Sequence, residues 1–120
     1  MATVDIGPPK VDLLRIRAGD RNLFTMKLTQ NDQPFDLTGL TIEAQARSTP
    51  IDTVIAVTAV ITVIDAEQGH FEMRWPGNEV RALVADKVAW NGVWDLQVGN
   101  GSDPQTLMAG VFTVEPDVTR

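Results

Sequence analysis

The sequence predicts an all-β fold: an antiparallel β-sandwich of about seven strands with one short helix. Three observations lead to this prediction. Short runs of alternating polar and apolar residues follow one another along nearly the whole chain, clusters of turn-forming residues separate them, and helical spacing of apolar residues is confined to a single segment. Short connections join antiparallel neighbours, because a parallel pair needs a long crossover. Two packed sheets then share one core, and a closed barrel is the main alternative.

The clearest predicted strand covers residues 40–47 and follows a proline-containing turn at residues 33–39. A period of two over this length is typical of a strand with one buried face. Gly39 lies just before the strand, where it supplies a backbone conformation that residues with a side chain resist. The residues expected to face the core are Leu40, Ile42, Ala44 and Ala46, and those expected to face solvent are Thr41, Glu43, Gln45 and Arg47.

Six further segments complete the predicted strands: residues 11–17, 22–29, 53–65, 70–75, 88–98 and 105–115. Their alternation places large apolar side chains on the inner faces of the sheets. The side chains expected to fill the core are Phe24, Ile42, Phe71, Trp75, Trp94 and Phe112. The Asn91-Gly92 pair is expected to form a bulge or the turn that leads into its strand.

One short helix is predicted at residues 79–86, where it would cross an end of the sheets. Apolar residues recur there at helical spacing, and Asn78 is expected to be the N-cap.

The run at residues 53–65 is the longest β-rich segment, and both of its faces carry apolar side chains. A strand at the surface of a soluble domain normally exposes one polar face. The run is therefore a central strand covered on both sides, a strand with a bulge that shifts its alternation, or a strand with one face against another subunit. An exposed edge of this composition would favour aggregation unless a partner covered it.

The length and composition indicate one globular domain, with 120 residues of which 43% are hydrophobic and 22% charged. We expect residues 11–120 to form this single β-sandwich domain. Residues 1–10 contain Gly7-Pro8-Pro9, which stiffens the backbone, and are expected to form an extended N-terminal arm.

The formal net charge of −6 argues against nucleic-acid binding, which needs clustered Lys and Arg. The chain has no cysteine, so it has neither disulfides nor thiolate metal sites, as expected for assembly in a reducing cytoplasm. No signal peptide is recognisable at the start of the chain, and no apolar run reaches the length of a membrane span. We therefore expect a protein made in the cytoplasm without nucleic-acid or membrane partners.

No constellation of catalytic or ligand-binding residues is evident in the sequence. His70 is the only histidine and alternates onto a solvent-facing position, which does not favour a metal site or a catalytic triad. Asp65 and Glu67 share a turn without the spacing of a calcium loop. Gly99 and Gly101 lack the following helix that a phosphate site needs. We therefore predict no enzyme activity, no catalytic, metal-binding or cofactor-binding residues, no cofactor and no small-molecule substrate.

Five segments match, in order and spacing, the motifs of one known family. Residues 18–20 match an x-G-D turn, residues 34–42 an x-P-x-D-L-T-G-x-x-V strand start, and residues 69–73 a G-x-F-x-L strand. Residues 92–98 match a Y-x-Y-D-L-x-V strand and residues 110–120 a G-x-x-x-V-x-x-D-V-T-R ending. Together they resemble small tailed-phage virion proteins with an immunoglobulin-like β-sandwich, including the N-terminal domain of phage baseplate upper proteins.

The match to the Y-x-Y-D-L-x-V strand is partial. Gly92 and Trp94 stand at the two tyrosine positions of that pattern.

The resemblance implies a non-enzymatic structural component of a tailed bacteriophage virion, synthesised in the host bacterial cytoplasm. A place in the tail or baseplate is preferred, with head decoration or the head-to-tail region next. The expected partners are other virion proteins and copies of the same chain, contacted through the arm at residues 1–10 and the run at residues 54–64.

The alternative is a carbohydrate- or receptor-binding β-sandwich module. This alternative predicts that Trp75, Trp90 or Trp94 lies at the surface beside acidic residues.

Overall fold

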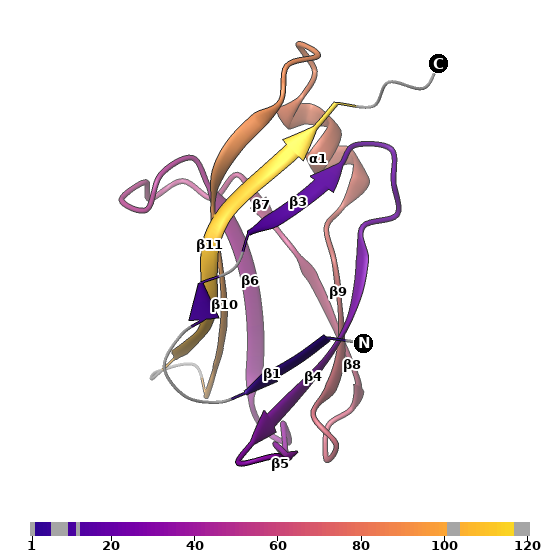
Figure 1. The fold of residues 1–120 in the computed structure, drawn as a ribbon, viewed down its shortest axis with the longest axis vertical. Helices are drawn as coiled ribbons and strands as arrows, with labels where there is room; N and C mark the ends of the chain where they lie inside the picture. Colours follow the sequence, from indigo (N-terminus) through magenta and orange to yellow (C-terminus); the bar gives the residue numbers. More distant parts are fainter. Residues whose placement is uncertain (1, 6–9, 12, 101–103, 117–120) are drawn as a thin grey trace.

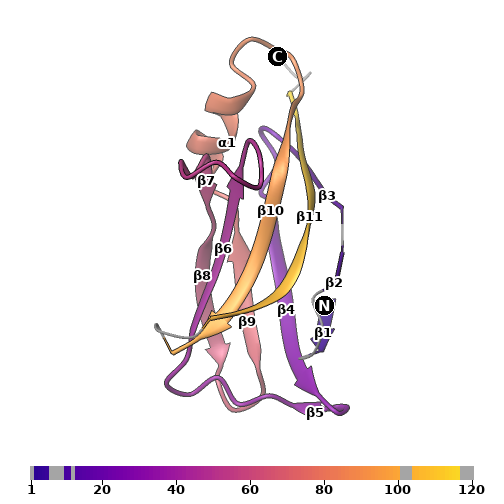
Figure 2. The ribbon, with the colours of Figure 1, turned by 90° about the vertical axis from the view of Figure 1, so that its left-hand side faces the viewer.

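Two β-sheets pack face to face as separate layers, with one short helix at an end of the sandwich (Figures 1 and 2). The computed structural model describes residues 2–5, 10–11, 13–100 and 104–116, and the molecule measures 43 × 30 × 21 Å. The predicted all-β sandwich with one short helix is confirmed, and the two sheets do not close into a barrel.

Eleven strands make up the two sheets in the described part of the chain, more than the predicted seven, because several are only two residues long. Sheet A has the order β1-β4-β9-β8, with β5 also paired to β4. Its strands are β1 (Ala2–Asp5), β4 (Leu23–Gln30), β5 (Gln33–Pro34), β8 (Val60–Asp65) and β9 (His70–Arg74). Sheet B has the order β2-β11-β10-β6-β7, with β3 also paired to β11. Its strands are β2 (Lys10–Val11), β3 (Leu14–Arg17), β6 (Thr41–Arg47), β7 (Val57–Thr58), β10 (Trp90–Gly99) and β11 (Gln105–Glu115).

The three N-terminal strands run parallel to their neighbours, whereas the other pairs are antiparallel as predicted. Strand β1 lies beside β4, and β2 and β3 lie beside β11. Strands β1 and β2 include residues that were expected to form an extended arm. The division into an arm at residues 1–10 and a domain at residues 11–120 stays a prediction, and Gly7-Pro8-Pro9 lies outside the described residues.

The prediction of one long strand at residues 53–65 is wrong, because the chain changes sheets within this run. The Ala59 N–H donates to Ala44 O of β6 at 2.9 Å, whereas Val60 already pairs with Arg74 of β9. The run therefore contains β7 in sheet B and β8 at the margin of sheet A. It is not a central covered strand, and an irregularity of the β8–β9 register lies between Val63 and Asp65.

Helix α1 spans Gly77–Leu83, so it begins and ends earlier than predicted. The predicted N-cap, Asn78, is wrong: Pro76 is the N-cap, without a side-chain capping bond, and its carbonyl accepts the Val80 N–H at 3.0 Å. Proline fixes the backbone angle that starts the helix directly after Trp75. Val80 is buried, which anchors the helix over the end of the core.

The bulge or entry turn expected at Asn91-Gly92 is also wrong, because both residues lie within β10, where the β10–β11 register is regular. The irregularity lies instead between Leu96 and Gln97, which pair with Met108 and Thr106 of β11, so Leu107 has no partner in the β10–β11 register. Leu107 and its neighbour Met108 are therefore both buried, although alternation would place one of them outside.

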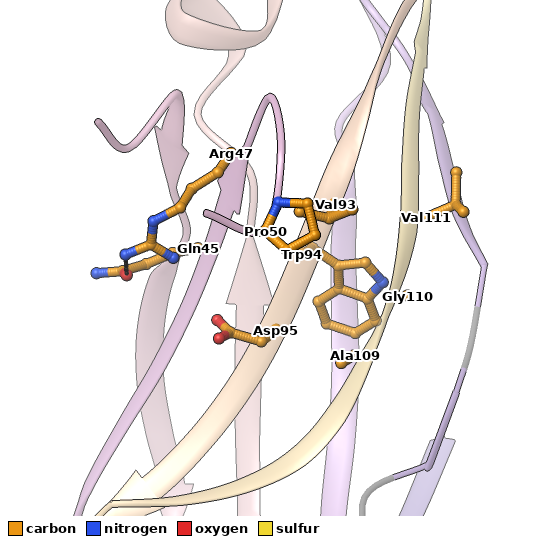
Figure 3. A pocket seen from close by; sticks show the side chains of 9 residues that line it. All are labelled: Gln45, Arg47, Pro50, Val93, Trp94, Asp95, Ala109, Gly110 and Val111. Carbon is orange, nitrogen blue, oxygen red and sulfur yellow. Dashed lines mark hydrogen bonds between the residues drawn. The ribbon is translucent and has the colours of Figure 1, made fainter. Parts of the chain in front are cut away.

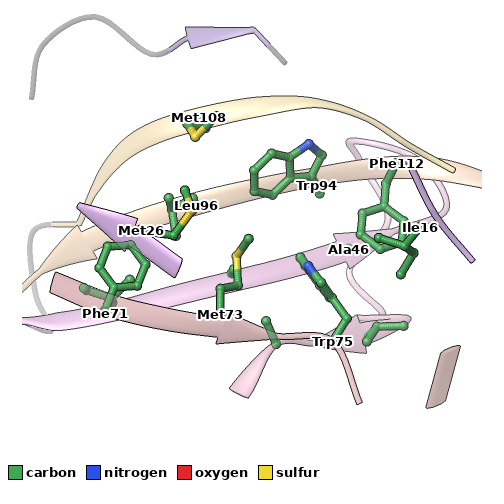
Figure 4. Close-up of a cluster of buried hydrophobic side chains, with 14 of the residues drawn as sticks. Ile16, Met26, Ala46, Phe71, Met73, Trp75, Trp94, Leu96, Met108 and Phe112 are labelled. Atoms are coloured by element: carbon green, nitrogen blue, oxygen red, sulfur yellow. The ribbon is translucent and has the colours of Figure 1, made fainter. Parts of the chain in front are cut away.

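The core fills the space between the two sheets (Figure 4). Aromatic side chains join the sheets close to α1, which begins two residues after Trp75. Trp75, directly after β9, meets Phe112 of β11 edge to face, with ring centroids 4.8 Å apart, and Trp94 of β10 at 6.3 Å. Five of the six predicted core residues are buried, and Phe24 is half-buried.

We expect Trp75→Ala to lower the free energy of unfolding by about 3–5 kcal/mol, because it opens a cavity between the sheets. Urea denaturation with an unchanged slope measures this loss. Trp75→Phe should cost less, since the indole N–H has no hydrogen-bond partner among the described residues. The matched control is Val88→Ala at an exposed position, expected within about 0.5 kcal/mol of wild type. A loss from Trp75→Ala no larger than this control would contradict the assigned packing.

Candidate interaction surfaces

The turn before β6 is fixed by one carboxylate. The Thr38 hydroxyl and N–H donate to Asp36 Oδ1 at 2.6 and 2.9 Å, and the Leu40 N–H donates to Leu37 O at 2.9 Å. The two bonds from Thr38 lower the pKa of the Asp36 carboxyl below its ordinary value of 3.8. Gly39 follows at φ +79°, as predicted. Asp36 thus organises a turn.

This turn is docked onto the β8–β9 hairpin. The Leu37 N–H of the turn donates to Ala66 O at 2.7 Å. In the neighbouring strand β4, the Leu28 N–H donates to Gly69 O of the same hairpin at 2.9 Å. Gly69 has φ +71°, and a Cβ there would lie 2.8 Å from Phe35 O and closer still to Leu28 O. Only glycine fits between these backbones, so the G-x-F-x-L motif serves the packing of one hairpin against its neighbours.

The first candidate surface is the β8 edge, which we define as Val60–Asp65. Val60, Val63 and Ile64 are exposed on it, although valine and isoleucine are among the side chains most often found inside proteins. Val54 and Ile55 in the preceding loop are exposed as well. The sequence predicted a docking role for residues 54–64, and the structure leaves five of their apolar side chains exposed, whereas Val57 and Ala59 are buried.

The second candidate surface is an apolar hollow of about 460 Å³ on the outer face of sheet B (Figure 3). The Arg47 Nη2 donates to Gln45 Oε1 at 3.0 Å at its rim, and Asp95 also lies at the rim. The lining consists of Gln45, Arg47, Pro50, Val93, Trp94, Asp95, Ala109, Gly110 and Val111.

Sequence reasoning missed this hollow, because its walls come from β6, β10 and β11. The available signal was apolar residues at outward positions. Val93 interrupts the polar row Asn91, Asp95 and Gln97 of β10, and its partner in the β10–β11 register is the exposed Val111.

The tryptophans do not form an exposed platform. Trp75 and Trp94 are buried, and half-buried Trp90 packs on Phe112 with ring centroids 6.1 Å apart. A Cβ at Gly92 would collide with the Trp90 ring, so this indole occupies the space beside the position where the family pattern has a tyrosine. The surface that the carbohydrate-binding alternative requires is therefore not formed by Trp75 or Trp94.

The described residues include no group of three or more histidine, cysteine or acidic side chains placed to hold a metal ion. His70 lies half-buried on β9 opposite Lys27 of β4. Within the same described part, no helix is long and apolar enough to cross a membrane.

Comparison with protein families matches residues 2–82 to the family described as the BppU N-terminal domain, the N-terminal domain of baseplate upper proteins. Among solved structures, the chain is similar to the "N-terminal domain of phage TP901-1 ORF48". That similarity covers 96% of this chain and 94% of the other, with a TM-score of 0.50 and 13% sequence identity, so it bears on the fold alone. No curated protein matches the sequence.

We expect Asp36→Asn to change the pH dependence of folding stability. Because the folded-state pKa of Asp36 is lowered, its contribution is present above the ordinary pKa and is lost as the pH falls through the folded value. Urea denaturation between pH 2.5 and pH 7 should therefore show the wild type and Asp36→Asn converging in acid. Thr38→Ala, which keeps the backbone donor and removes the hydroxyl, should retain part of the effect. A wild-type advantage that is equal at both ends of the pH range would refute this role.

Proposed function

This chain belongs to the BppU N-terminal domain family of phage baseplate proteins, and on that premise we propose that it is a non-enzymatic structural component of a tailed-phage virion. The family match over residues 2–82 is the observation that carries the proposal. The mode of action is protein–protein contact in repeated copies. Each contact contributes a modest binding free energy, and the total over the copies in a particle is large. The protein is synthesised in the host bacterial cytoplasm and then incorporated into the particle.

The two candidate surfaces support a docking role. The β8 edge offers a strand margin together with apolar side chains, and the hollow on sheet B offers an apolar depression with a polar rim. Sheet edges and apolar depressions rimmed by polar groups are surfaces that proteins use for recognition. The partners are other virion proteins and copies of the same chain, without nucleic acid, membrane or small-molecule substrate.

The net charge of −6 supports this assignment of partners. An acidic domain repels a phosphate backbone, and its charge favours solubility at the high local concentration of an assembling particle.

A place in the tail or baseplate follows the family most directly, with head decoration or the head-to-tail region as the next assignment. The family name refers to the baseplate, and the solved structure with a similar fold is also a phage domain.

The test is quantitative mass spectrometry of purified particles of the phage that encodes this chain. We expect the particles to contain the protein at a constant ratio to known tail proteins. Its copy number should be a multiple of the number of symmetry-related positions in one virion substructure. Lysate cleared of particles is the matched control. Recovery of the protein only in that cleared lysate would contradict a virion role.

A further inference from the structure

Strand β8 forms one margin of sheet A, and no described strand lies on its outer side (Figure 2). It pairs with β9 in an antiparallel register. In such a pair, the N–H and C=O groups of alternate residues point away from the neighbouring strand. The outer row of β8 is therefore a template on which a further strand can pair.

Two other sheet margins are protected in ways that β8 is not. Strand β7 is only two residues long. Strand β3 carries Arg15 and Arg17, whose guanidinium groups lie 3.6 and 3.1 Å from the Glu115 carboxylate. Residues 60–64 contain no charge and no proline, and all five are β-branched. Natural edges are usually blunted by brevity, charge or proline, so β8 has the composition of a strand that is covered in use.

The core beside β8 is also open. Val63 pairs with fully buried Phe71, which places its side chain on the inner face of sheet A, yet 46% of Val63 is exposed. The cause is the short β7, which ends at Thr58 and leaves the sandwich uncovered on this side. A strand added along β8 would cover this inward side chain.

We propose that β8 pairs antiparallel with β8 of a second copy, across a two-fold axis at Thr62. This inference rests on the proposed function and names the partner and geometry of one of its contacts. In this register Val60 faces Ile64 of the second copy, and Thr62 faces its own equivalent. Val60 and Ile64 are 42% and 56% exposed, so both have apolar surface to bury. Apolar β-branched pairs and facing threonines both stabilise adjacent strands.

The charges around β8 favour the antiparallel orientation. Arg74 is exposed on β9 beside Val60, at one end of the edge, and Asp65 lies at the other end. Antiparallel pairing brings the Arg74 end of one copy toward the Asp65 end of the other, whereas parallel pairing would bring like ends together. Since each chain carries a net charge of −6, an arrangement that avoids like charges at the contact is needed for self-association.

The contact is small. Two six-residue strands bury less than the roughly 1,200 Å² of a standard interface, so the isolated dimer is weak and is reinforced by repetition in a particle. The β8–β9 irregularity between Val63 and Asp65 falls at Ile64, so Ile61–Val63 form the regular centre of the pairing and the contacts between Val60 and Ile64 lie at its two ends.

A single cysteine tests the register directly, because the chain has none of its own. Facing residues of antiparallel strands have Cα atoms about 4.5–5.5 Å apart, within the range of about 4.4–6.8 Å that a disulfide spans. We expect purified Thr62→Cys to oxidise to a covalent dimer at least about tenfold faster than Thr25→Cys, because pairing raises the effective thiol concentration. Thr25 is the matched control, since it is an exposed threonine of the same sheet that pairs with Glu72 of β9, as Thr62 does, but lies on β4 and not on the β8 edge.

Sedimentation of variants without cysteine provides the second measurement. Wild type should dimerise as its concentration rises, and Thr62→Lys should weaken the dimer at least about tenfold, because two lysines then meet at the axis. Thr25→Lys should dimerise as wild type does, and thermal unfolding checks that both variants fold.

Wild type that stays monomeric up to about 1 mM, with Thr62→Cys oxidising no faster than Thr25→Cys, would overturn the self-pairing. That result does not bear on the virion role, which is tested separately by the composition of purified particles. Failure of Thr62→Lys to enter particles, together with monomeric wild type, would also overturn it and identify a different virion protein as the occupant of the edge.

Discussion

The fold depends on an aromatic contact across the sandwich. Trp75 leaves sheet A directly after β9 and meets Phe112 and Trp94 of sheet B edge to face. Aromatic side chains bury more apolar area than other residues, and edge-to-face geometry adds to that gain. Because Pro76 follows at once, the same contact fixes where helix α1 begins and closes one end of the core.

At one side of the sandwich, the chain crosses from sheet B to sheet A between β7 and β8. Ala59 is small enough to be buried at the crossing, and its N–H still bonds to sheet B. Strand β7 stops after two residues, so β8 has no cover on its outer side in the described chain. This crossing therefore leaves β8 as an uncovered edge of sheet A, and that edge is the proposed docking surface.

Period-two alternation predicted well wherever one strand stays in one sheet. Residues 105–115 are strand β11, and residues 41–47 of the run predicted at 40–47 are β6 with its buried face as expected. Alternation failed at residues 53–65, because it does not tell which sheet a residue joins. The predicted N-cap Asn78 was wrong because the helix begins after Pro76, whose fixed backbone angle outweighed side-chain capping. The hollow on sheet B was missed because only the fold brings strands β6, β10 and β11 together.

Hydrogen exchange measured by mass spectrometry, in the free protein and in purified particles, tests most directly the claim that the β8 edge is a docking surface. We expect the outward amides within Val60–Ile64 to exchange quickly in the free protein and to become protected in the particle. The amides of Met26 and Lys27 in β4 are the internal reference, since β1 pairs with them on one side and β9 on the other. Equal exchange of the β8 amides in the free protein and in the particle would contradict docking at the β8 edge.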